Sequence, residues 1–142
     1  MIDKSKKVMR LAGWSFAAAL ACTSAAALAA AMNLKLSGEE ENPPVQGSSS
    51  GTGTITINDD GSVSGSVTAS GFTPTAAHIH EGNDCTTGKV IVPLMKEGDS
   101  FKAPPGAKLT PDQMKSLKEG NLYVNIHSAA HPRGEVCAKL KS

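Results

Sequence analysis

The chain has 142 residues, of which 19% are charged and 4% aromatic, and its formal net charge is +1. After the basic residues at positions 4–10 no basic patch remains, and aromatic side chains are few, which argues against a nucleic-acid-binding protein. No internal repeat is visible, and the length suits one domain with one hydrophobic core.

The first 31 residues have the three parts of a secretory signal peptide. Four basic side chains precede an apolar run at residues 11–21, and small residues ending at Ala29 or Ala31 offer cleavage sites. Two alternatives are an uncleaved membrane anchor and a lipoprotein attached through Cys22. The apolar run is rich in alanine and poor in larger aliphatic residues, which favours cleavage over anchoring. We therefore expect a periplasmic or secreted protein whose mature domain is 32–142.

Export changes both the charge and the expected state of the cysteines. Residues 1–31 carry four basic side chains and one acidic one, so their removal takes the net charge from +1 to about −2. The mature chain keeps two cysteines, Cys85 and Cys137. In an oxidising compartment these two residues are expected to form a disulfide, and only one intramolecular pairing exists.

The mature chain consists of short alternating segments separated by turn residues, which predicts strands. Asp60-Gly61 between two such segments predicts a β-hairpin. A Gly/Ser-rich loop is expected at 46–53, and a loop or short edge around Phe101. The predicted strands cover 34–37, 54–58, 63–69, the histidine-containing segment near 78–80, a mostly buried segment at 89–94, 121–127 and 135–140.

One helix interrupts these strands. Thr110 is suited to the N-cap, Pro111 to the first helical position, Gln113 to a capping box and Gly120 to the position after the helix. The helix is too short to be stable alone, so it must pack on the sheet. The whole pattern predicts an all-β Greek-key β-sandwich or barrel with one short helix.

Two stretches contain all four histidines of the chain. In the first, His78 and His80 lie two residues apart on a predicted strand, so they share one face, while Ala77 and Ile79 point into the core. In the second, His127 shares its face with Tyr123 and Asn125. If the two strands are neighbours, the imidazoles converge on the solvent side of the sheet.

Four imidazoles without a free thiolate suit Cu(II) or Zn(II), and the affinity order favours copper over zinc. The candidate ligands are His78, His80, His127 and His131. The alternative is that the first two are exposed strand residues and the others lie in a loop, without a metal.

Five segments resemble the CHRD domain family, named from chordin, over nearly the whole mature chain. They are residues 36–45, 76–82, 109–114, 120–127 and 130–136. The family usually has arginine where this chain has Cys137, and Cys85 is also an addition. These two departures fit each other and favour a disulfide that many members lack.

A weaker resemblance is to the copper site of copper-zinc superoxide dismutases, which carry a His-x-His-Glu strand, a later copper histidine and a disulfide between the corresponding segments. The parallel elements here are His78 to Glu81, His127 and the cysteine pair. No histidine lies between His80 and His127, so the zinc-loop ligands have no counterpart. The resemblance implies a superoxide-dismutase-like or Ig-like fold and a copper-only site, with His131 as the fourth ligand and Arg133 attracting superoxide.

Three functions remain open from the sequence. The first is a copper-dependent, superoxide dismutase-like oxidoreductase, in which Arg133 is a catalytic candidate. The second is a non-catalytic copper carrier, which four closed histidine ligands would favour. The third is a metal-free structural or interaction module, as the chordin link suggests.

Overall fold

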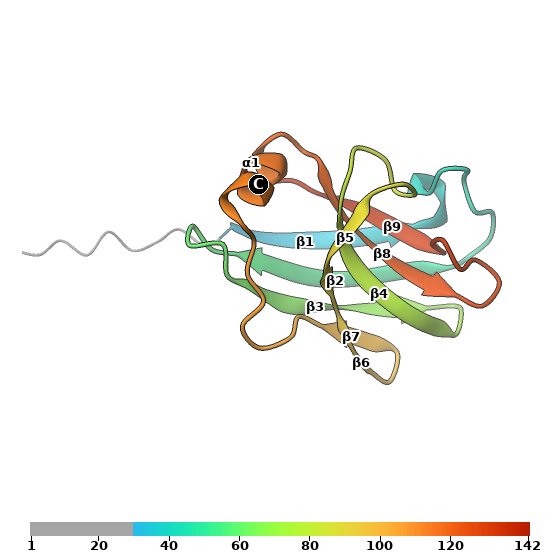
Figure 1. The fold of residues 1–142 in the computed structure, drawn as a ribbon. Coiled ribbons are helices and arrows are strands. Elements are labelled where there is room, and N and C mark those ends of the chain that lie inside the picture. Colours follow the sequence, from blue (N-terminus) through green and yellow to red (C-terminus); the bar gives the residue numbers. More distant parts are fainter. Residues whose placement is uncertain (1–29) are drawn as a thin grey trace, which may run out of the picture.

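The computed structural model describes residues 30–142. Only the last two residues of the predicted signal peptide are among them, and Cys22 lies outside the described residues. Nine strands, one 3-10 helix and one α-helix make up the described chain (Figure 1). In chain order they are β1 (Ala30–Ser37), η1 (Gly38–Glu40), β2 (Ser50–Ile57), β3 (Val63–Ser70), β4 (Pro74–Glu81), β5 (Lys89–Pro93), β6 (Met95–Glu97), β7 (Ser100–Lys102), α1 (Pro111–Lys118), β8 (Leu122–Ser128) and β9 (Val136–Leu140).

The predicted hairpin is confirmed by β2 and β3, which pair in antiparallel register up to Ile57 and Val63. Gly61 has a φ of +85°, a conformation that glycine adopts without a steric penalty. Its N–H donates to the carbonyl of Asn58 at 2.8 Å, which closes the turn.

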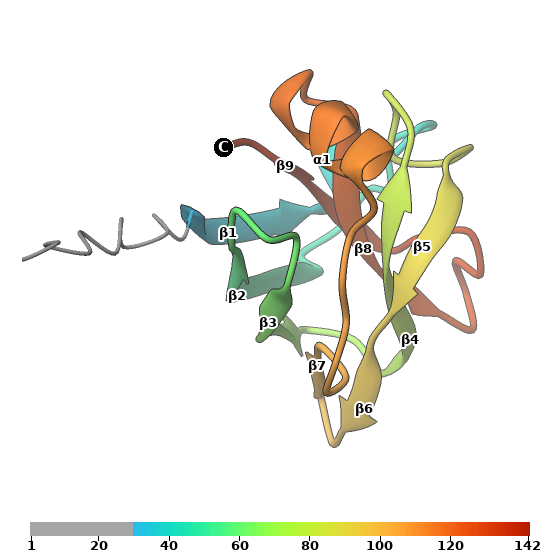
Figure 2. The ribbon, with the colours of Figure 1, turned by 60° about the vertical axis from the view of Figure 1, so that its left-hand side comes forward.

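The nine strands form one antiparallel sheet that curls into a nearly closed barrel. Their order is β5-β4-β8-β9-β1-β2-β3-β7-β6, so β5 and β6 are the two ends of the sheet. Only Leu94 separates these two strands in the chain, and its N–H donates to the carbonyl of Ala77 at 3.0 Å. Figure 2 shows β5 running on into β6, which joins the two edges. The connection from β3 crosses to β4 before β7 returns beside β3, as expected of a Greek-key fold. The predicted fold class is confirmed.

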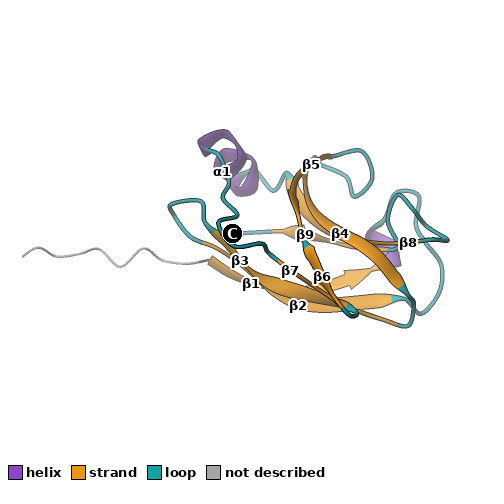
Figure 3. Ribbon diagram, turned by 60° about the horizontal axis from the view of Figure 1, so that its bottom comes forward, coloured by secondary structure: helices purple, strands orange, loops and turns teal. Residues whose placement is uncertain are grey.

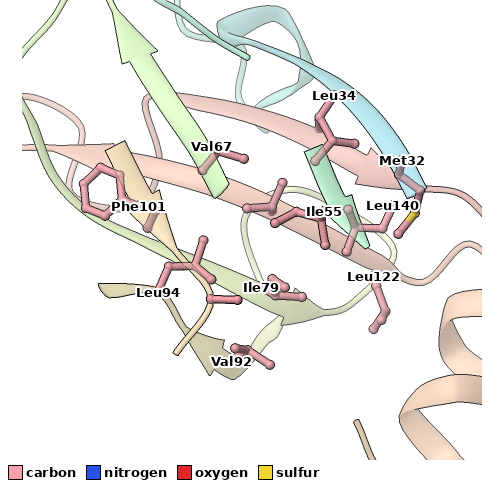
Figure 4. Close-up of a cluster of buried hydrophobic side chains, with 14 of the residues drawn as sticks. Met32, Leu34, Ile55, Val67, Ile79, Val92, Leu94, Phe101, Leu122 and Leu140 are labelled. Atoms are coloured by element: carbon pink, nitrogen blue, oxygen red, sulfur yellow. The ribbon is translucent and has the colours of Figure 1, made fainter. Parts of the chain in front are cut away.

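The barrel interior is an apolar core. Figure 3 shows the β1–β2–β3 side facing the β4–β5 side, and Figure 4 shows the side chains between them. Its fully buried members include Ile55, Val67, Ile79, Phe101 and Leu140. Burying an aliphatic or aromatic side chain of this size contributes about 1.5–3 kcal/mol each, so this core is the main source of stability.

The helix α1 covers one end of the barrel and has the predicted cap. The Thr110 hydroxyl accepts from the Gln113 N–H at 3.2 Å, and the Gln113 side chain accepts from the Thr110 N–H at 2.9 Å. Leu117 is buried against the core and Met114 packs beside it. Within residues 30–142, neither helix is long and apolar enough to span a membrane.

Some element boundaries and one burial prediction were wrong. Strand β2 begins at Ser50, inside the expected loop, and β1 already begins at Ala30. The segment at 89–94 is not mostly buried, since only Val92 and Leu94 are buried there. A barrel strand has one face toward the interior and one toward the outside, so a continuous apolar run need not be buried on both sides.

Candidate metal centre

Strands β4 and β8 bring three of the four histidines together. His78 and His80 lie on one face of β4, and His127 lies on the same side of the neighbouring strand β8. The candidate ligand nitrogens of these three residues all lie within 4.8 Å of one another. The expected convergence of the two histidine stretches is therefore confirmed for His78, His80 and His127.

Backbone carbonyls fix two of the rings. The Nδ1 atom of His80 lies 2.9 Å from the Gly88 carbonyl oxygen, and that of His127 lies 2.9 Å from the Pro132 carbonyl oxygen. A carbonyl can only accept, so each Nδ1 carries the proton and each Nε2 keeps its lone pair when the ring is neutral. Metal-binding histidines have this arrangement, in which the second nitrogen donates to an acceptor.

The two free Nε2 atoms have different surroundings. His80 Nε2 is buried and has no hydrogen-bond partner. His127 Nε2 lies 2.9 Å from His78 Nδ1. Because His127 Nε2 carries no proton, His78 Nδ1 is the donor of this hydrogen bond. A metal ion bound at His127 Nε2 would take the place of that proton, so metal uptake and the His78–His127 hydrogen bond exclude each other.

Burial favours the neutral form of His78 and His127. His80 and His127 are only 7% and 8% exposed, whereas His78 is half-buried. Burial, together with the neighbouring His127 and His80, lowers the pKa of His78 to about 4. Burial also lowers the pKa of His127, although its hydrogen bond to Pro132 opposes the shift. Neutral imidazole is the form that binds metal. His78 and His127 are therefore already in the metal-binding form at pH 7.

The histidine face is covered by loops, so the expectation of a solvent-exposed face was wrong. The β4–β5 loop carries Cys85, which forms the predicted disulfide with Cys137 of β9 at a Cα–Cα distance of 6.1 Å. The Asn42 N–H donates to the Thr86 hydroxyl at 3.1 Å, which ties the segment after η1 to this loop. Alternation placed the histidines on the outer face correctly, but it contains no information about what covers that face.

The β8–β9 loop, residues 129–135, is held by Glu135. Its carboxylate accepts hydrogen bonds of 2.6 Å from the hydroxyls of Ser49 and Ser128. Burial by itself raises the pKa of Glu135, but these hydrogen bonds and His131 outweigh it and hold the pKa below its usual value. The loop in turn supplies the Pro132 carbonyl that fixes His127.

The remaining predicted site residues lie in this same loop. The Nε2 atom of His131 is 3.7 Å from Glu135 Oε2, and His131 does not belong to the three-histidine group. Arg133 is exposed, and its backbone carbonyl accepts from the Asn125 side chain at 3.2 Å. Their roles as fourth ligand and catalytic residue stay predictions. His131 and Arg133 line a surface hollow of about 340 Å³ together with residues 41–45.

Sequence reasoning missed two contributors to this centre, and it also missed Glu41, a buried acid whose carboxylate lies against Gly134 of the β8–β9 loop. The carbonyls of Gly88 and Pro132 are backbone groups, which no side-chain pattern reveals. Glu41 is 4% exposed, and burial together with Glu135 raises its pKa to about 8. Its acidic neighbours Glu39 and Glu40 are exposed, and nothing in the run of three glutamates distinguishes the buried one.

This arrangement can hold one metal ion with three neutral nitrogen ligands. Three imidazole nitrogens suit copper and zinc alike. The group contains no thiolate, because Cys85 and Cys137 are joined in the disulfide.

Comparison with known proteins gives a match to a protein-family model. Neither the curated proteins nor the solved structures give a match to this chain. The family model for the CHRD domain matches residues 32–140. That match runs from within β1 to the end of β9 and includes all three histidines of the candidate metal centre. The chain therefore belongs to the CHRD domain family.

Proposed function

We propose that this protein binds a copper ion through His78, His80 and His127. The observation that carries the proposal is the buried His80 Nε2 atom, which has no hydrogen-bond partner while its Nδ1 is tied to Gly88. A buried polar atom without a partner costs about 1–3 kcal/mol, and a metal ion at this position would satisfy it.

The choice of copper rests on the donor set. All three donors are imidazole nitrogens, and no carboxylate belongs to the group. Among divalent first-row metals, affinity for nitrogen ligands peaks at copper, while zinc binds more weakly. A signal peptide at residues 1–31 would deliver the protein to the periplasm or the outside of the cell, and the disulfide fits such an oxidising compartment.

A superoxide dismutase-like activity is the sharper form of the proposal. A copper ion bound here would supply one-electron chemistry, by which two superoxide ions and two protons become dioxygen and hydrogen peroxide. His131 lies outside the three-histidine group, so a copper ion held by three imidazoles would have a coordination position left for superoxide. The exposed Arg133 adds positive charge to the loop that holds His127, where it would attract an anion.

A copper carrier without turnover is the second candidate, and the burial of His80 and His127 favours it. With both rings less than 10% exposed, only His78 offers an accessible side, and a small protected site suits storage or transfer. A metal-free structural or interaction module is the third.

Copper loading and a superoxide assay separate these functions. We expect one copper per chain in wild type, a loss of tight binding in His80→Ala, and little change in His131→Ala, the matched control from the neighbouring loop. Superoxide turnover that is lost in His80→Ala and reduced several-fold at low salt in Arg133→Ala would establish the enzyme. Stoichiometric copper without turnover would leave the carrier, and no copper uptake would contradict the proposal.

A further inference from the structure

Tyr123 lies directly opposite His80 across the β4–β8 pair. The two rings are stacked, with centroids 4.8 Å apart and an interplanar angle of 4°. Tyr123 is fully buried and packs with Cys85 and Cys137, the two halves of the disulfide. The phenol ring is therefore a fixed wall against one face of the His80 imidazole, and it restricts rotation of that imidazole.

Both rings also hold the same loop residue. The Gly88 N–H donates to the Tyr123 hydroxyl at 2.9 Å, and the Gly88 carbonyl oxygen lies 2.9 Å from His80 Nδ1. Because the hydroxyl fixes the position of Gly88, it also fixes the carbonyl that keeps the proton on His80 Nδ1. The atom left without a proton is Nε2, the one that belongs to the metal centre.

Gly88 has no room for a side chain at this contact. A Cβ there would lie 2.7 Å from Tyr123 Cε1, 2.8 Å from the Tyr123 hydroxyl oxygen and 2.8 Å from the Glu81 carbonyl oxygen. Real Cβ atoms do not approach other atoms so closely, so either Tyr123 or the loop must move when alanine replaces Gly88. The contact can therefore be disturbed from the loop as well as from the strand.

We propose that Tyr123 is a positioning residue of the metal centre. It touches no metal; it acts through His80, by stacking on the imidazole and by holding Gly88, so that Nε2 is the nitrogen presented to the ion. The effect on copper rests on the proposed function, whereas the effect on the His80 tautomer does not. Partners of this kind set the orientation of a metal-binding histidine, and their loss weakens metal binding about 10–100-fold.

Two measurements on four variants test this role. Nitrogen-15 NMR of the metal-free proteins reads the His80 tautomer, and competition titration gives the copper affinity. In Tyr123→Leu and Gly88→Ala we expect a mixture of His80 tautomers and a copper affinity about 10–100-fold lower than in wild type. Tyr123→Phe keeps the stacked ring and loses the hydroxyl, so its change should be smaller. Phe101→Leu is the matched control, since Phe101 is an equally buried ring in β7 outside the metal centre.

The outcomes separate a positioning role from a purely structural one. The proposal is overturned if both Tyr123→Leu and Gly88→Ala keep the wild-type tautomer and copper affinity, or if Phe101→Leu changes them equally. If Tyr123→Leu does not fold, Tyr123→Phe and Gly88→Ala decide the matter. A changed tautomer in these variants, with no copper binding by wild type, would support the positioning role and contradict the proposed function.

Discussion

The two faces of the β4–β8 pair are both largely buried, but the inner face is apolar and the outer face is polar. The inner face carries Ile79, Val124 and Ile126, which are fully buried and apolar. The outer face carries polar side chains that loops cover. Within the described residues, the buried side-chain atoms without a hydrogen-bond partner are His80 Nε2, Asn125 Oδ1 and Glu41 Oε1. All three belong to the outer face or to the loops over it. Burial on the inner face stabilises the fold, whereas burial on the outer face costs free energy unless something binds there.

Two adjacent residues of β4 give the largest expected contrast. Ile79→Ala should lower the free energy of unfolding by about 2–5 kcal/mol, because it removes a fully buried side chain from the core. His80→Ala should cost less, about 1–2 kcal/mol, because losing the hydrogen bond to Gly88 and the stacking on Tyr123 is partly offset by removing the buried Nε2 atom that has no partner. Denaturant unfolding of the metal-free proteins measures both values. A larger loss in His80→Ala than in Ile79→Ala would contradict the distinction between the two faces.

The disulfide holds the loop that covers the outer face. Replacing both Cys85 and Cys137 by serine should cost about 3–4 kcal/mol, as expected for a bridge that closes a loop of about 50 residues. It should also weaken copper binding, because Gly88 lies in the loop that this bridge anchors. Thr86→Ala, which removes only the link to Asn42, is the control and should cost about 1 kcal/mol. Unchanged copper affinity in the double serine variant would show that the loop does not support the centre.

Glu41 makes the stability of the outer face depend on pH. Its pKa is raised from 4.5 to about 8 by burial and by Glu135. Below pH 4.5 the carboxyl is protonated in the folded and unfolded states. Between pH 4.5 and 8 the folded state holds a proton that the unfolded state releases, so stability falls as the pH rises and the loss is complete above about 8. The total loss should be about 2–4 kcal/mol.

Glu41→Gln should remove this part of the pH dependence. Glu39→Gln, at an exposed position two residues earlier, makes the same chemical change and should leave the dependence intact. Unfolding curves at several pH values between 4 and 9 measure the effect. Identical pH profiles for wild type and Glu41→Gln would count against a buried neutral carboxyl.

The smallest expected effect is on copper binding between pH 8 and 6. Burial lowers the pKa of both His78 and His127, that of His78 to about 4, so competition by protons for these two rings should be weak in this range. The contribution of His78 to the stability of the metal-free fold should fall from pH 6.5 toward 4, because unfolded His78 takes up a proton before folded His78 does. This contribution opposes that of Glu41 in the same range, so it is measured in the Glu41→Gln background. A tenfold decrease in copper affinity between pH 7 and 6 would indicate ordinary, exposed imidazoles.

The sequence predicted the features that depend on short-range geometry. Alternation placed His78, His80 and His127 on one side of the sheet, Asp60-Gly61 marked the hairpin, and Thr110 with Gln113 marked the helix start. Each of these depends on residues close together in the chain. The pairing of β4 with β8 joins segments more than 40 residues apart, and only the expected disulfide and the family resemblance suggested that they meet.

Other features could not be predicted, because they depend on where loops fold back. The turn at 128–134 is closed by hydrogen bonds of the His131 carbonyl with the N–H groups of Ser128 and Gly134, at 3.3 and 3.1 Å. This conformation places His131 beside Glu135. From the sequence alone, a histidine four residues after His127 is equally compatible with a fourth ligand. The carbonyls of Gly88 and Pro132 belong to such loops as well, so their role is visible only in three dimensions.

The central claim is that His78, His80 and His127, without His131, form one copper site. Side-chain nitrogen-15 NMR spectra of the purified protein during titration with Cu(I) test it most directly, because this ion is diamagnetic. We predict that the signals of these three rings shift together and stop changing at one equivalent, while those of His131 stay in place. Shifts of His131 at the same equivalence point, or no shift of His80, would contradict the account.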